Sequence, residues 1–301
     1  MDRLQIVYSD ERVVVVDKPA GLLSVPPPKG QRDGSAHVQS VLLRLGVDAM
    51  PVHRIDQETS GLLLCARDAA TRELLMNMFK ARGVTKSYLA VVQGNPRQDT
   101  GSWIFPIKDL GAHAEISPEG QHAETRWKVI ERAGVVVLME LELVTGRHNQ
   151  ARLHAAHVCM PLAGETKYAM RRDAKIKHKR CALHAGLLEL TLPWETEPRR
   201  FESPLPQDMR ALLDKARAAP PRRKDPPAPS NPAQVAQHAR AQRLKANRAK
   251  PQQRSGRPPE RPSGRKPGLQ SGRKPGLQSG RKPGAQSGRK SAPKSARRRR
   301  P

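Results

Sequence analysis

Residues 51–67 read P-V-H-R-I-D-Q-E-T-S-G-L-L-L-C-A-R, and this stretch decides both the fold and the function of the chain. The carboxylate of Asp56 stands close to the basic side chains of His53 and Arg54, and a Thr-Ser-Gly turn leads from it into the apolar run 62–64. A charged group on a loop that a rigid strand holds is typical of a catalytic loop. The spacing alone fits a surface loop with a solvated ion pair ahead of a core strand equally well.

The composition divides the chain into two parts. All nine aromatic residues lie before position 202, whereas residues 219–301 hold 24 Lys or Arg, 15 of the 28 prolines and two acidic residues. This segment therefore carries most of the net charge of +27. It has too little apolar surface to offset the entropy of ordering, so we predict a disordered basic tail at 219–301. Residues 1–218 are rich in Val, Leu and Ile, and we expect them to form one folded domain.

The tail is a low-complexity segment. An octapeptide, S-G-R-K-P-G-L-Q, occupies residues 263–270 and 271–278 and returns with one change at 279–286. Such basic segments neutralise phosphates without reading base sequence, and their binding weakens steeply with salt. Residues 233–250 are expected to form a basic helix only on nucleic acid. A solubilising tail without a dedicated partner is the alternative.

Cysteine usage and the start of the chain suggest a compartment. Cys65, Cys159 and Cys181 are far apart with no Cys-x-x-Cys pair, which fits free thiols in a reducing environment. The first residues carry no secretory signal, and no apolar run reaches the length of a membrane span. We therefore expect a cytoplasmic monomer that does not bind membranes. No Cys or acidic residue completes a metal site around the histidines, so we expect no metal.

Hydrophobic periodicity predicts an α+β fold with a mainly antiparallel sheet and flanking helices. Strands are expected at 4–8, 13–16, 86–94, 103–107, 125–130, 135–144 and 181–192. Helices are expected at 35–45, 69–82, 145–157 and 205–217. Ser35 is predicted to cap the first helix and Gly83 to end the second.

Five segments together resemble the RluA family of RNA pseudouridine synthases, over residues 4–213. H-R-I-D-Q-E-T-S-G-L-L-L is similar to the family's signature loop, and residues 6–26 to its opening strand pair with a Lys-Pro-x-Gly turn. K-S-Y-L-A-V-V-Q-G is similar to its Lys-x-Tyr strand, and L-H-A-G-L-L-E-L-T-L-P to its last core strand. Residues 145–168 resemble its Thr-Gly-Arg…Gln-x-Arg-x-His helix and the Pro-x-x-Gly-(Asp/Glu) turn. The resemblance implies the pseudouridine synthase fold, in its compact, single-domain form.

The resemblance also implies a reaction and the residues that carry it. It implies an isomerase that converts uridine to pseudouridine in structured rRNA or tRNA without a cofactor. Asp56 would act on the anomeric carbon, either as a covalent nucleophile or by assisting elimination to a glycal. Tyr88 would stack on the base or act as general base. Arg152 would pair with Asp56 and keep it ionised against the effect of burial.

Three further residues are expected to bind RNA: Arg54, Arg147 and His53. The planar guanidinium of Arg54 can stack on bases, while the surroundings of His53 favour a supporting role. One departure stands out, because the family pattern Thr-His-Gln-Ile-Arg reads His-Asn-Gln-Ala-Arg at residues 148–152. We expect altered RNA contacts there. An RNA-binding or ribosome-assembly protein that uses the fold without catalysis is the alternative function.

Overall fold

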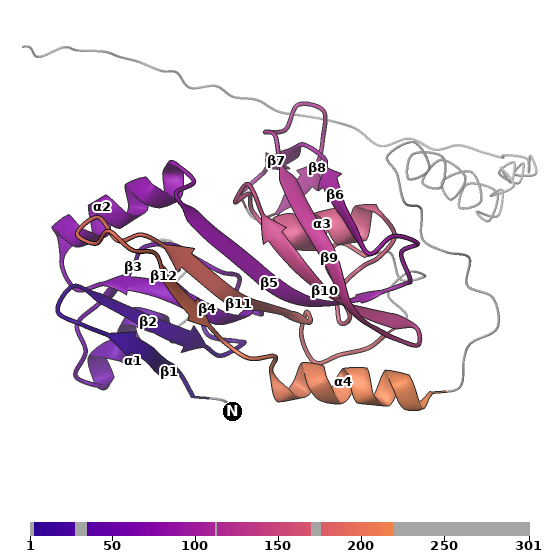
Figure 1. The fold of residues 1–301 in the computed structure, drawn as a ribbon, viewed down its shortest axis with the longest axis horizontal. Helices are drawn as coiled ribbons and strands as arrows, with labels where there is room; N and C mark the ends of the chain where they lie inside the picture. The colour runs from indigo at the N-terminus through magenta and orange to yellow at the C-terminus, as the bar shows by residue number, and fades with distance from the viewer. Residues whose placement is uncertain (1–2, 28–34, 112, 170–175, 220–301) are drawn as a thin grey trace, which may run out of the picture. The chain divides into compact units, whose positions relative to one another are not determined.

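The computed structural model describes residues 3–27, 35–111, 113–169 and 176–219 (Figure 1). The predictions of a disordered tail, of its octapeptide repeats and of a helix at 233–250 concern residues outside this described part. Within it, no helix is long and apolar enough to cross a membrane.

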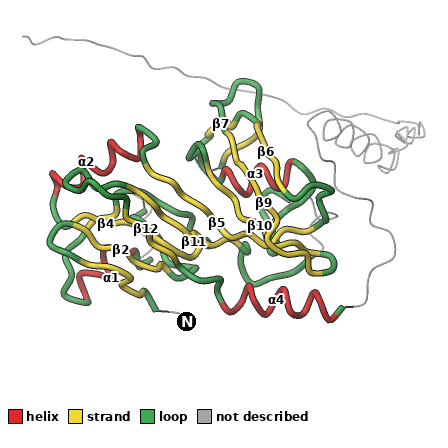
Figure 2. Tube along the Cα trace, viewed as in Figure 1, coloured by secondary structure: helices red, strands yellow, loops and turns green. Residues whose placement is uncertain are grey.

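A ten-stranded sheet is the centre of the fold (Figure 2). Its strands are β1 (Gln5–Ser9), β2 (Val13–Lys18), β3 (Met50–Pro51), β4 (Ser60–Ala66), β5 (Val84–Gln93), β6 (Thr100–Ile104), β9 (Glu124–Ala133), β10 (Val136–Leu143), β11 (Leu183–Leu190) and β12 (Arg199–Glu202). They lie in the order β1-β2-β4-β11-β5-β10-β9-β6, with β3 paired to β4 and β12 to β11. The pairs are antiparallel except β4 with β11, which is parallel. The predicted α+β class with a mainly antiparallel sheet is confirmed.

Some strands differ from their predicted ranges. The expected strand at 103–107 is two strands, because β6 ends at Ile104 and β7 (Ile107–Asp109) pairs instead with β8 (Ala114–Ile116) in a separate hairpin. The sequence pattern did not predict β12, whose residues R-R-F-E carry one apolar side chain. Pairing with β11 defines this strand, and a local pattern does not report such a tertiary contact.

Four helices flank the sheet: α1 (Val38–Arg44), α2 (Ala69–Lys80), α3 (Gln150–His157) and α4 (Gln207–Ala218). The prediction that Ser35 caps α1 is wrong, because His37 is the N-cap. The His37 ring accepts from the backbone N–H of Ser40 at 3.3 Å, and the Ser40 hydroxyl accepts from the backbone N–H of His37 at 3.1 Å. At the end of α2 it is Arg82, with φ 61°, that takes the left-handed conformation, rather than Gly83.

Both faces of the central strands are buried, which explains their unbroken apolar runs. On one face, Val14 and Val16 of β2 belong to a core that includes residues of α1 and α3. On the other face, Val13 and Val15 pack in a core with Leu75 of α2, and residues of α4 join a neighbouring cluster. The helices thus pack against both faces of the sheet, α1 and α3 on one and α2 and α4 on the other.

The parallel pairing of β4 with β11 places two parts of the site side by side. Gly61 of β4 is opposite Ala185 of β11, and Ala185 is opposite Tyr88 of β5. Gly61 has φ +112°, and a Cβ at this position would overlap the backbone of Ala185. Glycine is therefore required where the strand that follows Asp56 approaches β11.

Candidate active site

Asp56 lies on the loop between β3 and β4, and hydrogen bonds fix the backbone of this loop on both sides of Asp56. The Ser24 hydroxyl donates to the carbonyl oxygen of Ile55 at 2.6 Å and accepts from the Ile55 N–H at 3.1 Å. After Asp56, the carbonyl oxygen of Gln57 accepts from the N–H of Gly21 at 2.8 Å. The loop is therefore held against residues 18–24, whose sequence contains the Lys-Pro-x-Gly turn.

The buried side chain of Lys18 also ties the Asp56 loop to residues 18–24. Its side chain is fully buried, and its Nζ donates to the carbonyl oxygens of Pro19 at 2.9 Å, Leu22 at 2.8 Å and Gln57 at 3.2 Å. Burial lowers the pKa of Lys18 to about 7, while the negative charge of Asp56 opposes this shift. The sequence reading did not single out Lys18 as part of the site, although a lysine that directly continues a buried strand is a signal for such a role.

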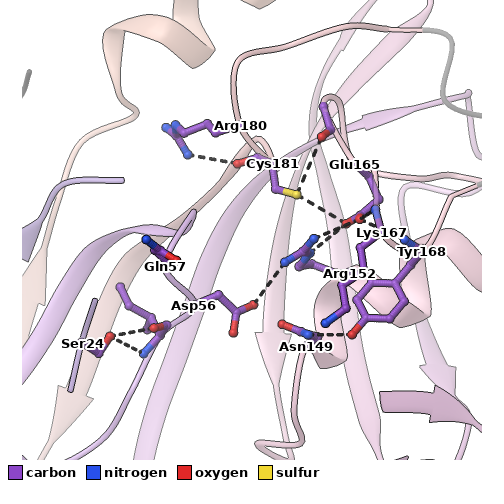
Figure 3. Close-up of polar contacts among 12 residues, drawn as sticks. Ser24, Asp56, Gln57, Asn149, Arg152, Glu165, Lys167, Tyr168, Arg180 and Cys181 are labelled. Carbon is purple, nitrogen blue, oxygen red and sulfur yellow. Dashed lines mark hydrogen bonds and ion pairs between the residues drawn. The ribbon is translucent and has the colours of Figure 1, made fainter. Parts of the chain in front are cut away.

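Arg152 of α3 faces the carboxylate of Asp56 (Figure 3). Its Nη1 lies 4.0 Å from Oδ2 of Asp56. The same guanidinium makes two hydrogen bonds to the buried Glu165, from Nε to Oε2 at 2.8 Å and from Nη2 to Oε1 at 3.0 Å. Burial acts to raise the pKa of Glu165, but the hydrogen bonds and charge of Arg152 outweigh it and lower that pKa. Glu165 is the acid of the Pro-x-x-Gly-(Asp/Glu) turn, but its pairing with Arg152 was not predicted, because that partner lies thirteen residues away on another element.

The pKa of Asp56 lies above its ordinary value. Burial is the largest cause, and the positive charges of Arg152, His148, Arg54 and Lys167 act in the opposite direction. The carboxylate nevertheless remains 24% exposed, so an incoming group can reach it. The predicted effect of Arg152 has the expected sign, but the cations do not fully cancel the effect of burial.

Asn149 supplies direct hydrogen bonds to this carboxylate. We orient its amide with the nitrogen toward Asp56, because a carboxylate only accepts hydrogen bonds. The nitrogen then donates to Oδ1 at 3.0 Å and Oδ2 at 2.6 Å. The amide oxygen accepts from the hydroxyl of Tyr168 at 2.6 Å and from Nε2 of His148 at 3.2 Å. Figure 3 shows the side chains of Asn149 and Tyr168 next to each other beside Asp56 and Arg152.

Gln150 shapes the turn that leads into α3. Its Oε1 accepts from the hydroxyl of Thr145 at 2.6 Å and from the N–H of Arg147 at 3.0 Å. Its Nε2 donates to the carbonyl oxygen of Glu124 at 2.8 Å. This explains why α3 begins at Gln150 rather than at the predicted residue 145, since residues 145–149 form a turn around the Gln150 side chain.

Tyr88 lies on β5 and is almost fully buried, with 8% of its surface exposed. Burial raises the pKa of its phenol, and the negative charge of Asp56 raises it further. The side chain therefore stays protonated at neutral pH, which favours contact with the face of a base over proton abstraction.

His53 has a structural position within the site. Its Nε2 accepts from the backbone N–H of Leu64 at 3.0 Å, and its ring stacks on Phe79 with centroids 4.4 Å apart. Burial, and secondly the charge of Lys86, lower the pKa of His53 to about 3. The ring is therefore neutral and can accept the hydrogen bond. Its expected contact with RNA stays a prediction.

One cavity of about 670 Å³ brings all the predicted residues together. Its lining includes Asp56, Tyr88, Arg152, Arg54, Arg147 and His53. It also includes three cations that sequence reasoning missed, Lys80, Arg82 and Lys86, from the end of α2 and the start of β5. The cations around the wall outnumber its two carboxylates, Asp56 and Glu142, so the cavity suits a polyanionic ligand. Among the described residues, no group of three or more His, Cys, Asp or Glu side chains is arranged to hold a metal ion.

Comparisons with known proteins agree with this arrangement. Residues 12–157 match the family described as RNA pseudouridylate synthase. The chain is 36% identical over 228 residues to the uncharacterized RNA pseudouridine synthase YlyB of Bacillus subtilis, covering 71% of this chain and 73% of that protein. It is 36% identical over 241 residues to ribosomal large subunit pseudouridine synthase D of Xanthomonas campestris pv. campestris, covering 72% of each. The solved structure of human RNA pseudouridylate synthase domain containing 1 has the same fold, with a TM-score of 0.57, 24% identity and coverage of 76% of this chain and 97% of that one.

Proposed function

The chain belongs to the RluA family of RNA pseudouridine synthases, and we propose that this isomerase modifies ribosomal RNA through the carboxylate of Asp56. The name of the Xanthomonas relative, a ribosomal large subunit pseudouridine synthase, supports the choice of substrate. The position of Asp56 supports its role, because it stands on a fixed loop at the wall of a cation-lined cavity.

The reaction needs an anionic group at the place where Asp56 stands. Isomerisation breaks the bond between C1′ of the ribose and N1 of uracil, and the bonding pair leaves with N1. The carboxylate then either bonds to the electron-poor C1′ or takes a proton from C2′, so that a glycal forms. After the base turns, C5 bonds to C1′ while the bond from C1′ to the carboxylate breaks or the proton returns to C2′. The C5 proton then leaves and N1 takes up a proton, so no atom is gained or lost.

Two neighbours complete the chemistry in this proposal. Arg152 stabilises the ionised form of Asp56, and Glu165 holds the guanidinium in place. Tyr88 stacks on the uracil while the base turns. Its raised pKa keeps the phenol protonated, which argues against a role as general base.

RNA reaches the cavity with the target uridine turned out of its loop. Arg54, Arg147 and the cations of α2 and β5 contact the phosphates and bases around it. The basic segment at 219–301 adds affinity that does not depend on base sequence. Deleting this segment is expected to flatten the salt dependence of RNA binding while turnover remains measurable. Loss of all turnover at low salt would contradict a separate catalytic domain at 1–218.

Asp56→Asn tests the role of the carboxylate, because the amide keeps the shape and loses the charge. We expect turnover to fall by on the order of a thousandfold or more, measured as release of tritium from ribosomal RNA that carries tritium at C5 of uridine. Asp214→Asn on the exposed side of α4 is the matched control and should react like the wild type. An Asp56→Asn variant with near-normal turnover would show that the mechanism is wrong. Mapping pseudouridine across rRNA and tRNA with and without the protein tests the substrate.

A further inference from the structure

Asn149 occupies an unusual place at the start of α3. It is the N-cap of this helix, yet its side chain makes no capping hydrogen bond, and its backbone has φ 52°, in the left-handed region. An N-cap Asn usually accepts from a backbone N–H of the first turn. Here the amide points instead at the carboxylate of Asp56. It also stands where the family pattern has histidine, so the contact belongs to the part of this chain that departs from the pattern.

The partners on both sides of the Asn149 amide fix which way it faces. The oxygen of Asn149 accepts from the hydroxyl of Tyr168 at 2.6 Å and from Nε2 of His148 at 3.2 Å. The other ring nitrogen of His148 lies 3.0 Å from Oδ1 of Asp109, at the end of β7. If the amide turned over, its oxygen would face the carboxylate oxygens of Asp56, which only accept hydrogen bonds when ionised, and both bonds to Asp56 would be lost. The amide therefore presents its N–H groups to Asp56 in a fixed orientation.

Asp56 needs such donors because its other main partner is not in hydrogen-bonding contact. The Nη1 of Arg152 is 4.0 Å from Oδ2, beyond the length of a hydrogen bond, and two other nitrogens of this side chain bind Glu165. Asn149 donates to both carboxylate oxygens, at 3.0 and 2.6 Å. Hydrogen bonds to the ionised form favour that form, and two of them also fix the plane of the carboxylate.

We propose that Asn149, oriented by Tyr168 and His148, is a positioning residue that holds both oxygens of Asp56 in the reactive orientation and keeps the carboxylate ionised. This inference rests on the proposed role of Asp56. The charged or titratable groups that act on Asp56 are Arg152, His148, Arg54, Lys167, Lys18 and Tyr88. The substitutions below leave all five basic side chains and the phenol of Tyr88 in place.

Asn149→Ala removes both donors and is tested by the pH dependence of turnover. We expect kcat to fall about tenfold at neutral pH, and the acid limb of the pH profile to move upward by about one unit, because the carboxylate loses hydrogen bonds that favour its charge. The KM for RNA should change by less than about threefold, because the amide does not contact RNA phosphates in this proposal. Tyr168→Phe should move the limb in the same direction by less, since Asn149 remains.

The control is Asn95→Ala, at an exposed asparagine that bonds to Arg132 away from the cavity. It should leave both kcat and the acid limb unchanged. Thermal unfolding of each variant verifies that the proteins are folded. A folded Asn149→Ala protein whose kcat falls equally at every pH, or does not fall, would overturn the inference. This outcome differs from failure of the proposed function, in which Asp56→Asn itself remains active.

Discussion

Arg152 and Glu165 form a two-point ion pair beside the loop that carries Asp56, with nitrogen–oxygen distances of 2.8 and 3.0 Å. Glu165 is the more deeply buried partner, and it also accepts from the backbone N–H groups of Lys167 and Tyr168. The pair therefore orients the guanidinium toward Asp56 and anchors the segment after residue 164 at the same time.

Glu165→Gln is expected to weaken both functions. The amide removes the closer of the two negative charges that face the buried guanidinium of Arg152, so the free energy of unfolding should fall by about 3 kcal/mol. Turnover should also fall, because the guanidinium is no longer fixed. Urea unfolding and tritium release measure the two effects. Glu119→Gln, whose partner Lys108 is exposed, should cost less than about 1 kcal/mol. Equal stability of the two variants would argue against this role of Glu165.

Lys18→Met is expected to make the loop that carries Asp56 less rigid. The variant loses three hydrogen bonds to backbone carbonyls, so turnover should fall by on the order of a hundredfold through misplacement of the carboxylate. The KM for RNA should change little, because Lys18 is buried beneath the loop.

The free energy of unfolding of the wild type and that of Lys18→Met should depend differently on pH. Lys18 has a pKa of about 7 when folded and close to its ordinary 10.5 when unfolded. Between these values the unfolded chain binds more protons, so this residue makes stability rise with pH from 7 to 10.5. Unfolding measured at several pH values should show a steeper rise for the wild type than for Lys18→Met. Parallel curves would mean that burial does not perturb Lys18.

Gly61→Ala is expected to disrupt the contact between β4 and β11. The added methyl group would overlap the backbone of Ala185 and would also force a side chain into a positive φ. We expect a loss of about 3 kcal/mol in the free energy of unfolding. Gly46→Ala separates the two causes, because Gly46 has φ +77° but open space around it. Its cost should be about 1 kcal/mol. Similar costs at both sites would show that close approach is unimportant.

Lys80 and Arg82 are exposed cations at the rim of the cavity. Replacing both by Ala should raise the KM for RNA and reduce the slope of log affinity against log salt by about 1.5, because each phosphate contact contributes about 0.7 to 0.9. The kcat should stay the same, since neither residue touches the reacting atoms. Lys215→Ala with Arg217→Ala on α4 is the charge-matched control. A reduced kcat with an unchanged KM would exclude a role for Lys80 and Arg82 in RNA binding.

Much of the fold could be predicted from the sequence, because burial of strands on both faces leaves long apolar runs such as 13–16 and 62–66. Six residues of the cavity lining were also predictable, since their types and order resemble a family pattern: Asp56, Tyr88, Arg152, Arg54, Arg147 and His53. The partners of these residues were not. The roles of Glu165 and Asn149 depend on contacts with side chains of other elements. Asn149 also makes no capping hydrogen bond, although its position at a helix start suggests one.

Local competition explains the remaining differences. Ser35 and His37 can both cap a helix, and the reciprocal bonds with Ser40 favour His37. The polar strand β12 has too little apolar content to be seen without its neighbour β11. The N-cap of α1 and the strand β12 both depend on which residues lie nearby in the folded protein, and the order of residues in the sequence does not give those neighbours.

The position of β11 has a consequence for the synthesis of the enzyme. This strand lies between β4, which follows Asp56, and β5, which carries Tyr88, and pairs with both. Its side chain His184 also reaches Ser60, 124 residues earlier, at 2.9 Å. A nascent chain that has emerged only as far as α3 already contains Asp56, Tyr88 and Arg152, but lacks the strand that joins β4 to β5. We therefore expect the protein to modify RNA only after residues 183–190 have left the ribosome.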